Sequence, residues 1–120
     1  MSRSRQSAKQ AGARFERIIA DYLAHHVDDR IDRRVKTGAK DRGDIAGVRL
    51  PDGGKVVIEC KDYGGSLKPG PWVKEAEQEA LNDDAALGLV IAKRRGVTDP
   101  GQQFVLMTVD DMITMMKSLR

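Results

Sequence analysis

Residues 44–61 read DIAGVRLPDGGKVVIECK, and this stretch decides the fold. Its two arms, residues 44–50 and 55–61, contain several β-branched side chains and flank the turn sequence PDGG at residues 51–54. Apolar runs on either side of a short Gly-containing turn are typical of a β-hairpin. The sequence therefore predicts two antiparallel strands that are joined by a short loop.

The charged residues of this hairpin are expected to share one of its faces. A symmetric loop would place Asp44 opposite Lys61, and it would also place Ala46 opposite Glu59. Opposed residues of an antiparallel pair point to the same side, as do residues two apart in one strand. Asp44, Glu59 and Lys61 would then meet at the open end of the hairpin, although a one-residue slip in register would separate them. The other face would be apolar and would pack on the core: Ile45, Val56, Ile58 and Cys60.

The elements outside the hairpin follow from the spacing of apolar residues and from turn and cap signals. They are expected at residues 8–26 (helix), 30–36 (strand), 72–82 (helix), 87–92 (strand), 104–107 (strand) and after Thr108 (helix). Pro71 suits the first turn of the second helix, and Thr108 can cap the third with Asp111 three residues on. With the hairpin included, the order α-β-β-β-α-β-β-α predicts an α/β (α+β) domain whose helices flank a central sheet.

The last helix carries an apolar stripe on one face, formed by Met112, Met115, Met116 and Leu119. Two interpretations of this stripe stay open. It can pack on the core of the domain, and a flexible Met-rich face can also serve as a subunit interface.

The composition of the 120 residues limits the class of protein. Cys60 is the only cysteine, which excludes a disulfide framework and a zinc site built on several thiolates. We expect it to be a packed strand thiol and not a nucleophile. No apolar run approaches the roughly 18 residues that span a bilayer, so we expect a cytoplasmic protein with no membrane partner. Residues 1–10 are basic with no apolar stretch behind them, and we expect a flexible basic arm before a single domain at residues 11–120.

The net charge of +3 is a mild basic bias, and the distribution of the basic residues is more informative. One cluster precedes Asp44, and another follows the predicted strand at residues 87–92. A single basic cluster is usually a solvated face. These clusters border the charged end of the hairpin, however, and therefore favour contact with DNA phosphates. The residues that we expect to bind DNA are Arg33, Arg34, Lys36, Lys40, Arg42, Lys93, Arg94 and Arg95.

Two carboxylates and an ammonium group at the end of an apolar strand are costly unless they are paired or bind a metal. One interpretation is a simple salt bridge of Lys61 with Asp44 or Glu59. The other is a divalent-cation site, because Mg²⁺ prefers carboxylate oxygens and can neutralise the charge of a scissile phosphate. Lys61 beside such an ion would stabilise the transition state, or would assist as a base if its pKa were lowered.

The segments GDI (residues 43–45) and VIECK (residues 57–61) on a short hairpin resemble the PD-(D/E)xK nuclease signature. Within that superfamily, most of the chain resembles the Holliday junction resolvases of archaea and their short phage-encoded relatives. The likeness includes a leading helix with the pattern Gly-x-x-Phe-Glu at residues 12–16. It implies a restriction-endonuclease-like fold, in which a mixed central β-sheet is flanked by helices. The proline of the motif's name does not stand beside the aspartate, where residues 42–43 are Arg-Gly.

The resemblance also implies roles for individual residues. Asp44 and Glu59 would bind the metal with help from the Cys60 carbonyl, and Lys61 would be the catalytic lysine. Glu16 matches the helix glutamate that completes the site in this family, although its position also suits a solvated residue beside the apolar stripe. Asp41 and Asp62 flank the motif and are second choices, as surface groups or as contacts of metal-bound waters.

The function that we predict from these patterns is Mg²⁺-dependent, structure-selective cleavage of four-way DNA junctions, with Mn²⁺ as a substitute metal. Two strands of a junction must be cut, so we expect a homodimer with one active site in each subunit. An alternative keeps the site and changes the substrate to other duplex or branched DNA, as in repair or restriction. An alternative of another class is a non-catalytic DNA-binding protein with a nuclease-like fold.

Overall fold

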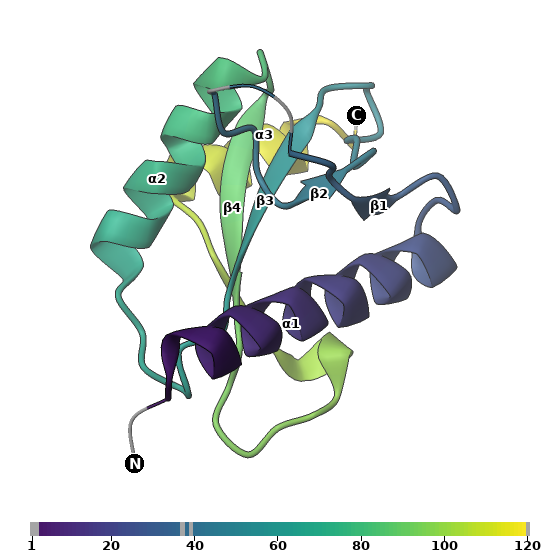
Figure 1. Ribbon diagram of the computed structural model, residues 1–120. Coiled ribbons are helices and arrows are strands. Elements are labelled where there is room, and N and C mark those ends of the chain that lie inside the picture. Colours follow the sequence, from purple (N-terminus) through teal and green to yellow (C-terminus); the bar gives the residue numbers. More distant parts are fainter. Residues whose placement is uncertain (1–2, 37, 39, 120) are drawn as a thin grey trace.

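The computed structural model describes residues 3–36, 38 and 40–119. Within these ranges the chain forms three helices and one five-stranded sheet (Figure 1). The elements are α1 (Arg5–His26), β1 (Asp32–Arg33), β2 (Ile45–Ala46), β3 (Val56–Lys61), α2 (Pro69–Asn82), β4 (Leu87–Ala92), the 3₁₀ turn η1 (Pro100–Gln102), β5 (Phe104–Leu106) and α3 (Val109–Lys117). The predicted order of helices and strands is therefore present, with one 3₁₀ turn added. The fold is a mixed α+β fold.

The strands lie in the sheet in their sequence order, β1-β2-β3-β4-β5. The pair β3–β4 is parallel, and the pairs β1–β2, β2–β3 and β4–β5 are antiparallel. The parallel pair needs a crossover, which α2 supplies. Both β3 and β4 are six residues long, whereas β1 and β2 are two residues each and shorter than predicted.

The helix α1 begins at Arg5, three residues before the predicted start. The side chain of Ser4 accepts a hydrogen bond from the Ser7 N–H and caps the helix. Residues 5–10, which we expected in a flexible arm, therefore lie in α1, and residues 1–2 lie outside the described ranges.

The register of the predicted hairpin differs from a symmetric loop. Ile45 pairs with Ile58, so Asp44 is level with Glu59 and not with Lys61 as we predicted. Nearer the turn, Arg49 forms a bridge with Lys55. The first arm therefore carries an unpaired residue between these two points, where Gly47 has a φ of +89°. The total offset from the expected pairing is two residues at β2, an even number, so the side chains keep their expected faces.

The two faces of the sheet are covered by different helices (Figure 1). On one face, Phe15 and Ile19 of α1 belong to the same buried cluster as Ile45, Ile58 and other strand residues. This confirms the predicted apolar face of the hairpin, including Cys60, which packs against the cluster. The other face carries Val90 and Ala92, which are buried under Trp72 and Ala76 of α2. Glu59 and Lys61 belong to this second face, because they pair in register with Val90 and Ala92.

The helix α3 is capped as predicted, since the Thr108 hydroxyl accepts a hydrogen bond from the Asp111 N–H. Its apolar stripe, however, does not pack on the core as a whole. Met115 contacts the cluster under α1, whereas Met112, Met116 and Leu119 are exposed. The interpretation of the stripe as a core face is therefore wrong for three of its four residues. None of the described helices is both long and apolar enough to cross a membrane.

Candidate metal and nucleic-acid site

The carboxylate of Asp44 is held at the start of β2 and is only 3% exposed. Its Oδ2 accepts a hydrogen bond of 2.8 Å from the Cys60 backbone N–H, and its own backbone N–H donates to the Ile58 carbonyl at 2.9 Å. Its Oδ1 lies 3.0 Å from the Nζ of Lys36. The residue before it, Gly43, has a φ of +92°, and a Cβ there would lie 2.7 Å from a methyl carbon of Val57. A glycine is therefore needed to bring this carboxylate against β3.

Glu59 and Lys61 come from β3 and point toward α2. The Nζ of Lys61 lies 3.6 Å from Oε1 of Glu59 and 2.9 Å from Oε1 of Glu75, on α2. Glu59 is buried, and its Oε2 has no hydrogen-bond partner among the described residues. A simple salt bridge therefore explains how the charge of Lys61 is compensated, and its closest partner is Glu75. It leaves one oxygen of Glu59 without a partner, and Asp44 pairs with Lys36 instead.

A third buried carboxylate, Glu79 of α2, lies beside Glu59. Glu79 is 2% exposed, and both of its oxygens lack a hydrogen-bond partner in the described part of the chain. Asp41, Glu59 and Glu79 each offer an oxygen, and these three atoms lie within 4.8 Å of one another. Glu79 was not among the site residues predicted from the sequence. The pattern that could have revealed it is its helical spacing, because Glu79 shares the inner face of α2 with Trp72 and Ala76.

Burial raises the pKa of Glu59 above its ordinary range, and the neighbouring Glu79 and Asp44 raise it further. Burial also raises the pKa of Glu79. Removal of a carboxylate from water disfavours its charged form unless a cation lies beside it. The pair therefore holds a proton at pH values where exposed glutamates are ionised, or it binds a cation.

The pKa of Lys61 is also raised. Burial works against the charged ammonium, but the hydrogen bond that Lys61 donates to Glu75 and the charge of Glu59 outweigh it. A lysine with a raised pKa stays protonated at neutral pH, so the metal-free surroundings of Lys61 favour a charged ammonium. Burial likewise raises the pKa of the Cys60 thiol, which argues against a nucleophilic role.

A hollow of about 400 Å³ connects these groups with α1. The predicted site residues that line it are Glu16, Asp44, Glu59, Cys60 and Lys61. Glu16 projects from α1, and its Oε1 forms an ion pair of 3.1 Å with Arg33. Burial and the negative charge of Asp44 raise the pKa of Glu16, and Arg33 opposes this shift. Glu16 therefore lies near Asp44 and lines the same hollow.

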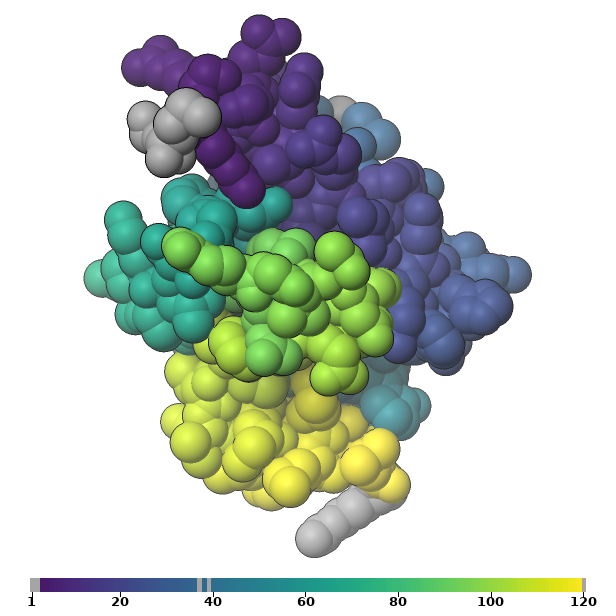
Figure 2. Space-filling model, turned by 90° about the horizontal axis from the view of Figure 1, so that it is seen from below, coloured from purple at the N-terminus to yellow at the C-terminus, as the bar shows by residue number. Residues whose placement is uncertain are grey.

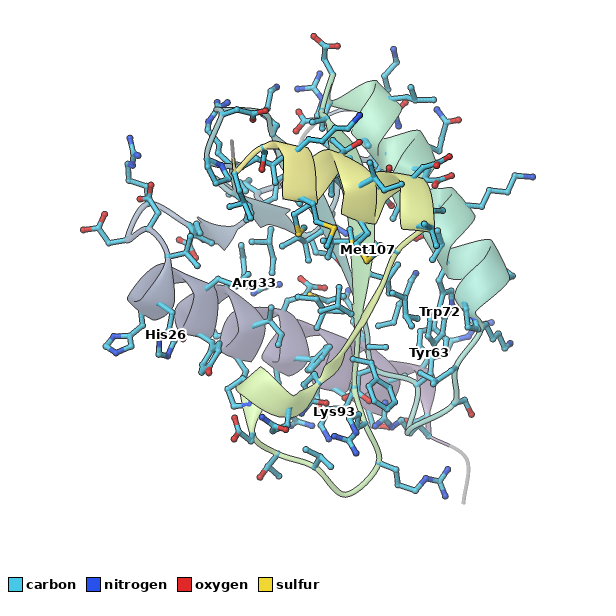
Figure 3. The ribbon with its side chains drawn as sticks, turned by 180° about the vertical axis from the view of Figure 1, so that it is seen from behind. His26, Arg33, Tyr63, Trp72, Lys93 and Met107 are labelled. Carbon is cyan, nitrogen blue, oxygen red and sulfur yellow. The ribbon has the colours of Figure 1, made fainter. Side chains whose placement is uncertain are left out.

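The basic residues before Asp44 are divided between internal pairs and the surface. Arg33 lies beside α1, where it pairs with Glu16 (Figure 3). Arg34 pairs with Asp83 at 3.3 Å, and Lys36 pairs with Asp44. Exposed residues of the group line a second hollow next to the first: Lys36, Lys40 and Arg42. Residues 37 and 39 of this loop lie outside the described ranges.

The second basic cluster lies on the other side of the β3 end. Lys93 donates hydrogen bonds to the carbonyls of Arg94 and Val97, so its ammonium is engaged in its own loop. Arg94 lies over the ring of Phe104, and Arg95 donates to the Gly64 carbonyl. Figure 2 shows the start of α1 (purple), the segment after β3 (teal) and the loop after β4 (green) together on one face.

The two aromatic residues after β3 lie next to one another (Figure 3). The ring centroids of Tyr63 and Trp72 are 5.1 Å apart. Trp72 is buried, whereas 53% of Tyr63 is exposed. Tyr63 also lines the hollow with Asp44 and Lys61.

Comparisons with protein-family models, curated proteins and solved structures found no match for this chain.

Proposed function

We propose that this protein is a Mg²⁺-dependent DNA endonuclease that selects branched substrates, as a Holliday junction resolvase does. The observation that carries the proposal is the group of buried carboxylates at the end of β3, with Lys61 beside it. Asp44 and Glu59 are 3% and 6% exposed, and Oε2 of Glu59 has no hydrogen-bond partner among the described residues. Burying a carboxylate costs free energy unless a cation lies beside it, so the presence of several buried carboxylates at one place favours a metal site.

The donor set fits a hard divalent cation. Asp44 and Glu59 would hold Mg²⁺ through carboxylate oxygens, with the Cys60 carbonyl as a third ligand, and Mn²⁺ would substitute. When bound, the cation supplies Lewis-acid activation of the phosphodiester and neutralises charge on it. The restriction-endonuclease-like form of the fold belongs to this proposal, since Asp44 and Glu59 stand on neighbouring strands of a mixed sheet.

The remaining residues of the site have distinct tasks. Lys61 would stabilise the negative charge that develops on the phosphate in the transition state. Glu75 holds the ammonium of Lys61 in place at 2.9 Å. Glu16 on α1 lines the same hollow and would complete the carboxylate set.

The basic residues on both sides of the hollow support a DNA substrate. Contacts from such side chains go to phosphates, which position a nucleic acid without reading its sequence. Lys40 and Arg42 are exposed on one side, and Arg95 is exposed on the other. Shape and phosphate spacing would then select the substrate, as cleavage of a branched junction requires.

A junction contains two strands to cut, so the proposal includes a homodimer with two-fold symmetry. Exposed apolar residues on one side of α3 offer a surface for it, which we call the exposed stripe: Val109, Met112, Ile113 and Met116. On α3, exposed Asp110 and Lys117 are seven residues apart and share one flank of this stripe. An antiparallel pair of α3 helices would bring each Asp110 to the partner subunit's Lys117, so the surface is complementary to a second copy of itself.

The experiment that tests the function compares cleavage of a four-way junction with cleavage of a linear duplex of the same sequence. It uses the wild type and Asp44→Asn, with and without Mg²⁺. We expect paired, Mg²⁺-dependent nicks in the junction alone, which Asp44→Asn abolishes. Equal cutting of the duplex would support a nuclease without junction selectivity. Salt-dependent binding without any cutting would support the non-catalytic DNA-binding alternative instead.

A further inference from the structure

A second group of carboxylates lies beside the proposed catalytic site and is not explained by it. Asp41 comes from the loop before β2, Glu59 from β3 and Glu79 from α2, and one oxygen of each lies within 4.8 Å of the others. Glu79 and Asp41 do not line the hollow that contains Asp44 and Glu16. Only Glu59 belongs to both groups.

The loop that carries Asp41 is held in place on both sides. Oδ1 of Asp41 accepts a hydrogen bond of 2.9 Å from the Gly43 N–H. The Asp41 backbone carbonyl accepts another of 2.8 Å from the side-chain amide of Asn82. Asn82 is three residues after Glu79 on α2. The arrangement therefore ties the loop to the helix end at which Glu79 is buried.

Glu79 is the observation that points to a ligand. Its exposed fraction is 2%, and neither of its oxygens accepts a hydrogen bond from a donor group of the described residues, so the neighbouring carboxyl of Glu59 can bind it only through a shared proton. Oε2 of Glu59 is also buried, and it has no hydrogen-bond partner within the parts of the chain that the structure describes. A buried carboxylate without a partner is strongly disfavoured unless it is protonated or contacts a cation.

The basic side chains near this group are engaged elsewhere. Lys61 reaches Oε1 of Glu59 at 3.6 Å but binds Glu75 more closely. Two other basic residues of this region, Arg34 and Lys55, form ion pairs with Asp83, although Nε of Arg34 is buried without a hydrogen-bond partner among the described residues. No ion pair in the described part of the chain includes Glu79. A bound cation would satisfy this group where the side chains do not.

We propose that Asp41, Glu59 and Glu79 form a second divalent-cation site, which takes Mg²⁺ or Mn²⁺ and shares Glu59 with the site on Asp44. All its side-chain ligands are carboxylate oxygens, which hard cations of this kind prefer. The cation joins three elements, because its ligands come from α2, β3 and the loop that leads to Asp44. It therefore fixes the path of the chain into Asp44. The proposal rests on the proposed function only through Glu59, since the cation would bind in the absence of DNA.

The test is Mn²⁺ binding to the full chain without DNA, measured by calorimetry and by the electron paramagnetic resonance signal of free Mn²⁺. We expect the wild type to bind two Mn²⁺ ions. Glu79→Gln and Asp41→Asn should each weaken one of them by at least about tenfold. Glu77→Gln, on the same helix but outside the group, is the matched control and should bind as the wild type does. Asp44→Asn should keep the ion that depends on Glu79.

A second measurement guards against variants that fold poorly. Mn²⁺ should raise the Tm of Asp44→Asn, and this rise should disappear when Glu79→Gln is added to it. The proposal is overturned if Glu79→Gln binds as many Mn²⁺ ions as the wild type, with equal affinity. The binding test does not depend on DNA cleavage. A protein that binds two ions but cuts no DNA in the separate junction assay would therefore refute only the nuclease proposal.

Discussion

The Cys60 backbone N–H donates a hydrogen bond of 2.8 Å to Oδ2 of Asp44. A side chain thereby takes the place of a strand partner at the end of β3, where β2 has not yet begun. The same contact brings the Asp44 carboxylate next to the residue that follows Glu59. This hydrogen bond therefore stabilises the end of β3, and it also positions the Asp44 carboxylate for its proposed role as a metal ligand.

Two substitutions separate these tasks. Asp44→Ala leaves the Cys60 N–H without its partner and should lower the free energy of unfolding by about 1–3 kcal/mol. Asp44→Asn keeps an oxygen that can accept this hydrogen bond, so its stability should stay closer to the wild type. Both should lose Mg²⁺-dependent cleavage of a junction. Urea unfolding gives the stabilities, and equal losses of stability in the two variants would contradict the structural task.

Gly43 is expected to be essential for the approach of the chain to β3. Its φ of +92° is unfavourable for a residue with a side chain, and a Cβ there would lie 2.7 Å from a Val57 methyl carbon. Gly53 has a similar φ of +95° with nothing within 4 Å, so Gly53→Ala measures the backbone cost alone. We expect about 1–2 kcal/mol for Gly53→Ala and clearly more for Gly43→Ala. Equal values in urea unfolding would show that the Val57 contact is relieved without cost.

Lys61 is expected to act through its charge. Lys61→Met keeps most of the length and loses the ammonium, so junction cleavage should fall by about 100-fold or more. Mn²⁺ binding should persist, because Lys61 is not among the proposed ligands. Glu77→Gln is again a suitable control for the region. Single-turnover cleavage at saturating Mg²⁺ is the measurement, and a variant that cleaves at the wild-type rate would exclude Lys61 from the reaction.

The elements around this site differ in how far they can be predicted from the sequence. The strand at residues 87–92 was predicted with its observed bounds, because six consecutive small or apolar residues have few alternatives. The register of the hairpin was not. It depends on an unpaired residue near Gly47, where a Cβ would lie 3.0 Å from the Arg30 carbonyl. Such a contact between distant segments leaves no periodic trace in the sequence.

The residues of the site also differ in how far they can be predicted from the sequence. Asp44, Glu59 and Lys61 could be singled out because they interrupt or end apolar strands. Glu79 could have been found from its spacing with Trp72 and Ala76, yet a charged residue on the inner face of a helix is usually ascribed to an edge of the apolar stripe. Its burial follows from the way α2 covers Glu59, which is a tertiary relationship. The pairing of Lys36 with Asp44 likewise depends on the path of the loop between them.

The buried pair of Glu59 and Glu79 should make the stability of the metal-free protein depend on pH. Both have a folded-state pKa above the ordinary value of 4.5, chiefly because of burial. A raised folded-state pKa means that the stabilising contribution is complete below pH 4.5 and is lost as the pH rises through the folded-state pKa. In EDTA, the Tm should therefore fall as the pH rises from 4.5 through the pKa of Glu79 at about 7 toward that of Glu59 at about 10.

Asp28 and Asp32 should act in the opposite direction and only in acid. Their pKa values are lowered, chiefly by hydrogen bonds from Arg30 and from Arg17 respectively, so their contribution to stability is lost as the pH falls.

The variant Glu79→Gln tests the prediction for the buried pair. Its side chain cannot ionise, so the fall in Tm at neutral and higher pH should be less steep than in the wild type. Excess Mn²⁺ should reverse the fall in the wild type. An unchanged slope in Glu79→Gln would show that other groups cause the dependence.

The exposed stripe of α3 should determine the oligomeric state. Ile113 and Met116 are 42% and 59% exposed, and they lie on the face that an antiparallel α3 pair would bury. A glutamate at either position would place a charge in that contact without a partner, so Ile113→Glu and Met116→Glu should be monomers. Thr114→Glu, exposed on the same helix but off the stripe, is the control and should remain a dimer. Sedimentation equilibrium gives the masses.

Charge reversal tests the orientation of the two helices. Asp110→Lys and Lys117→Asp should each weaken the dimer, because each brings like charges together across the two-fold axis. The double variant restores opposite charges at the same distance and should recover the dimer. In a parallel pair the two copies of Asp110 would lie on opposite flanks of the contact and neither would meet Lys117, so the single reversals would leave the dimer unchanged. If the wild type were a monomer, the exposed stripe of α3 would have no part in the proposed function, and each protein molecule could cut only one strand at a time.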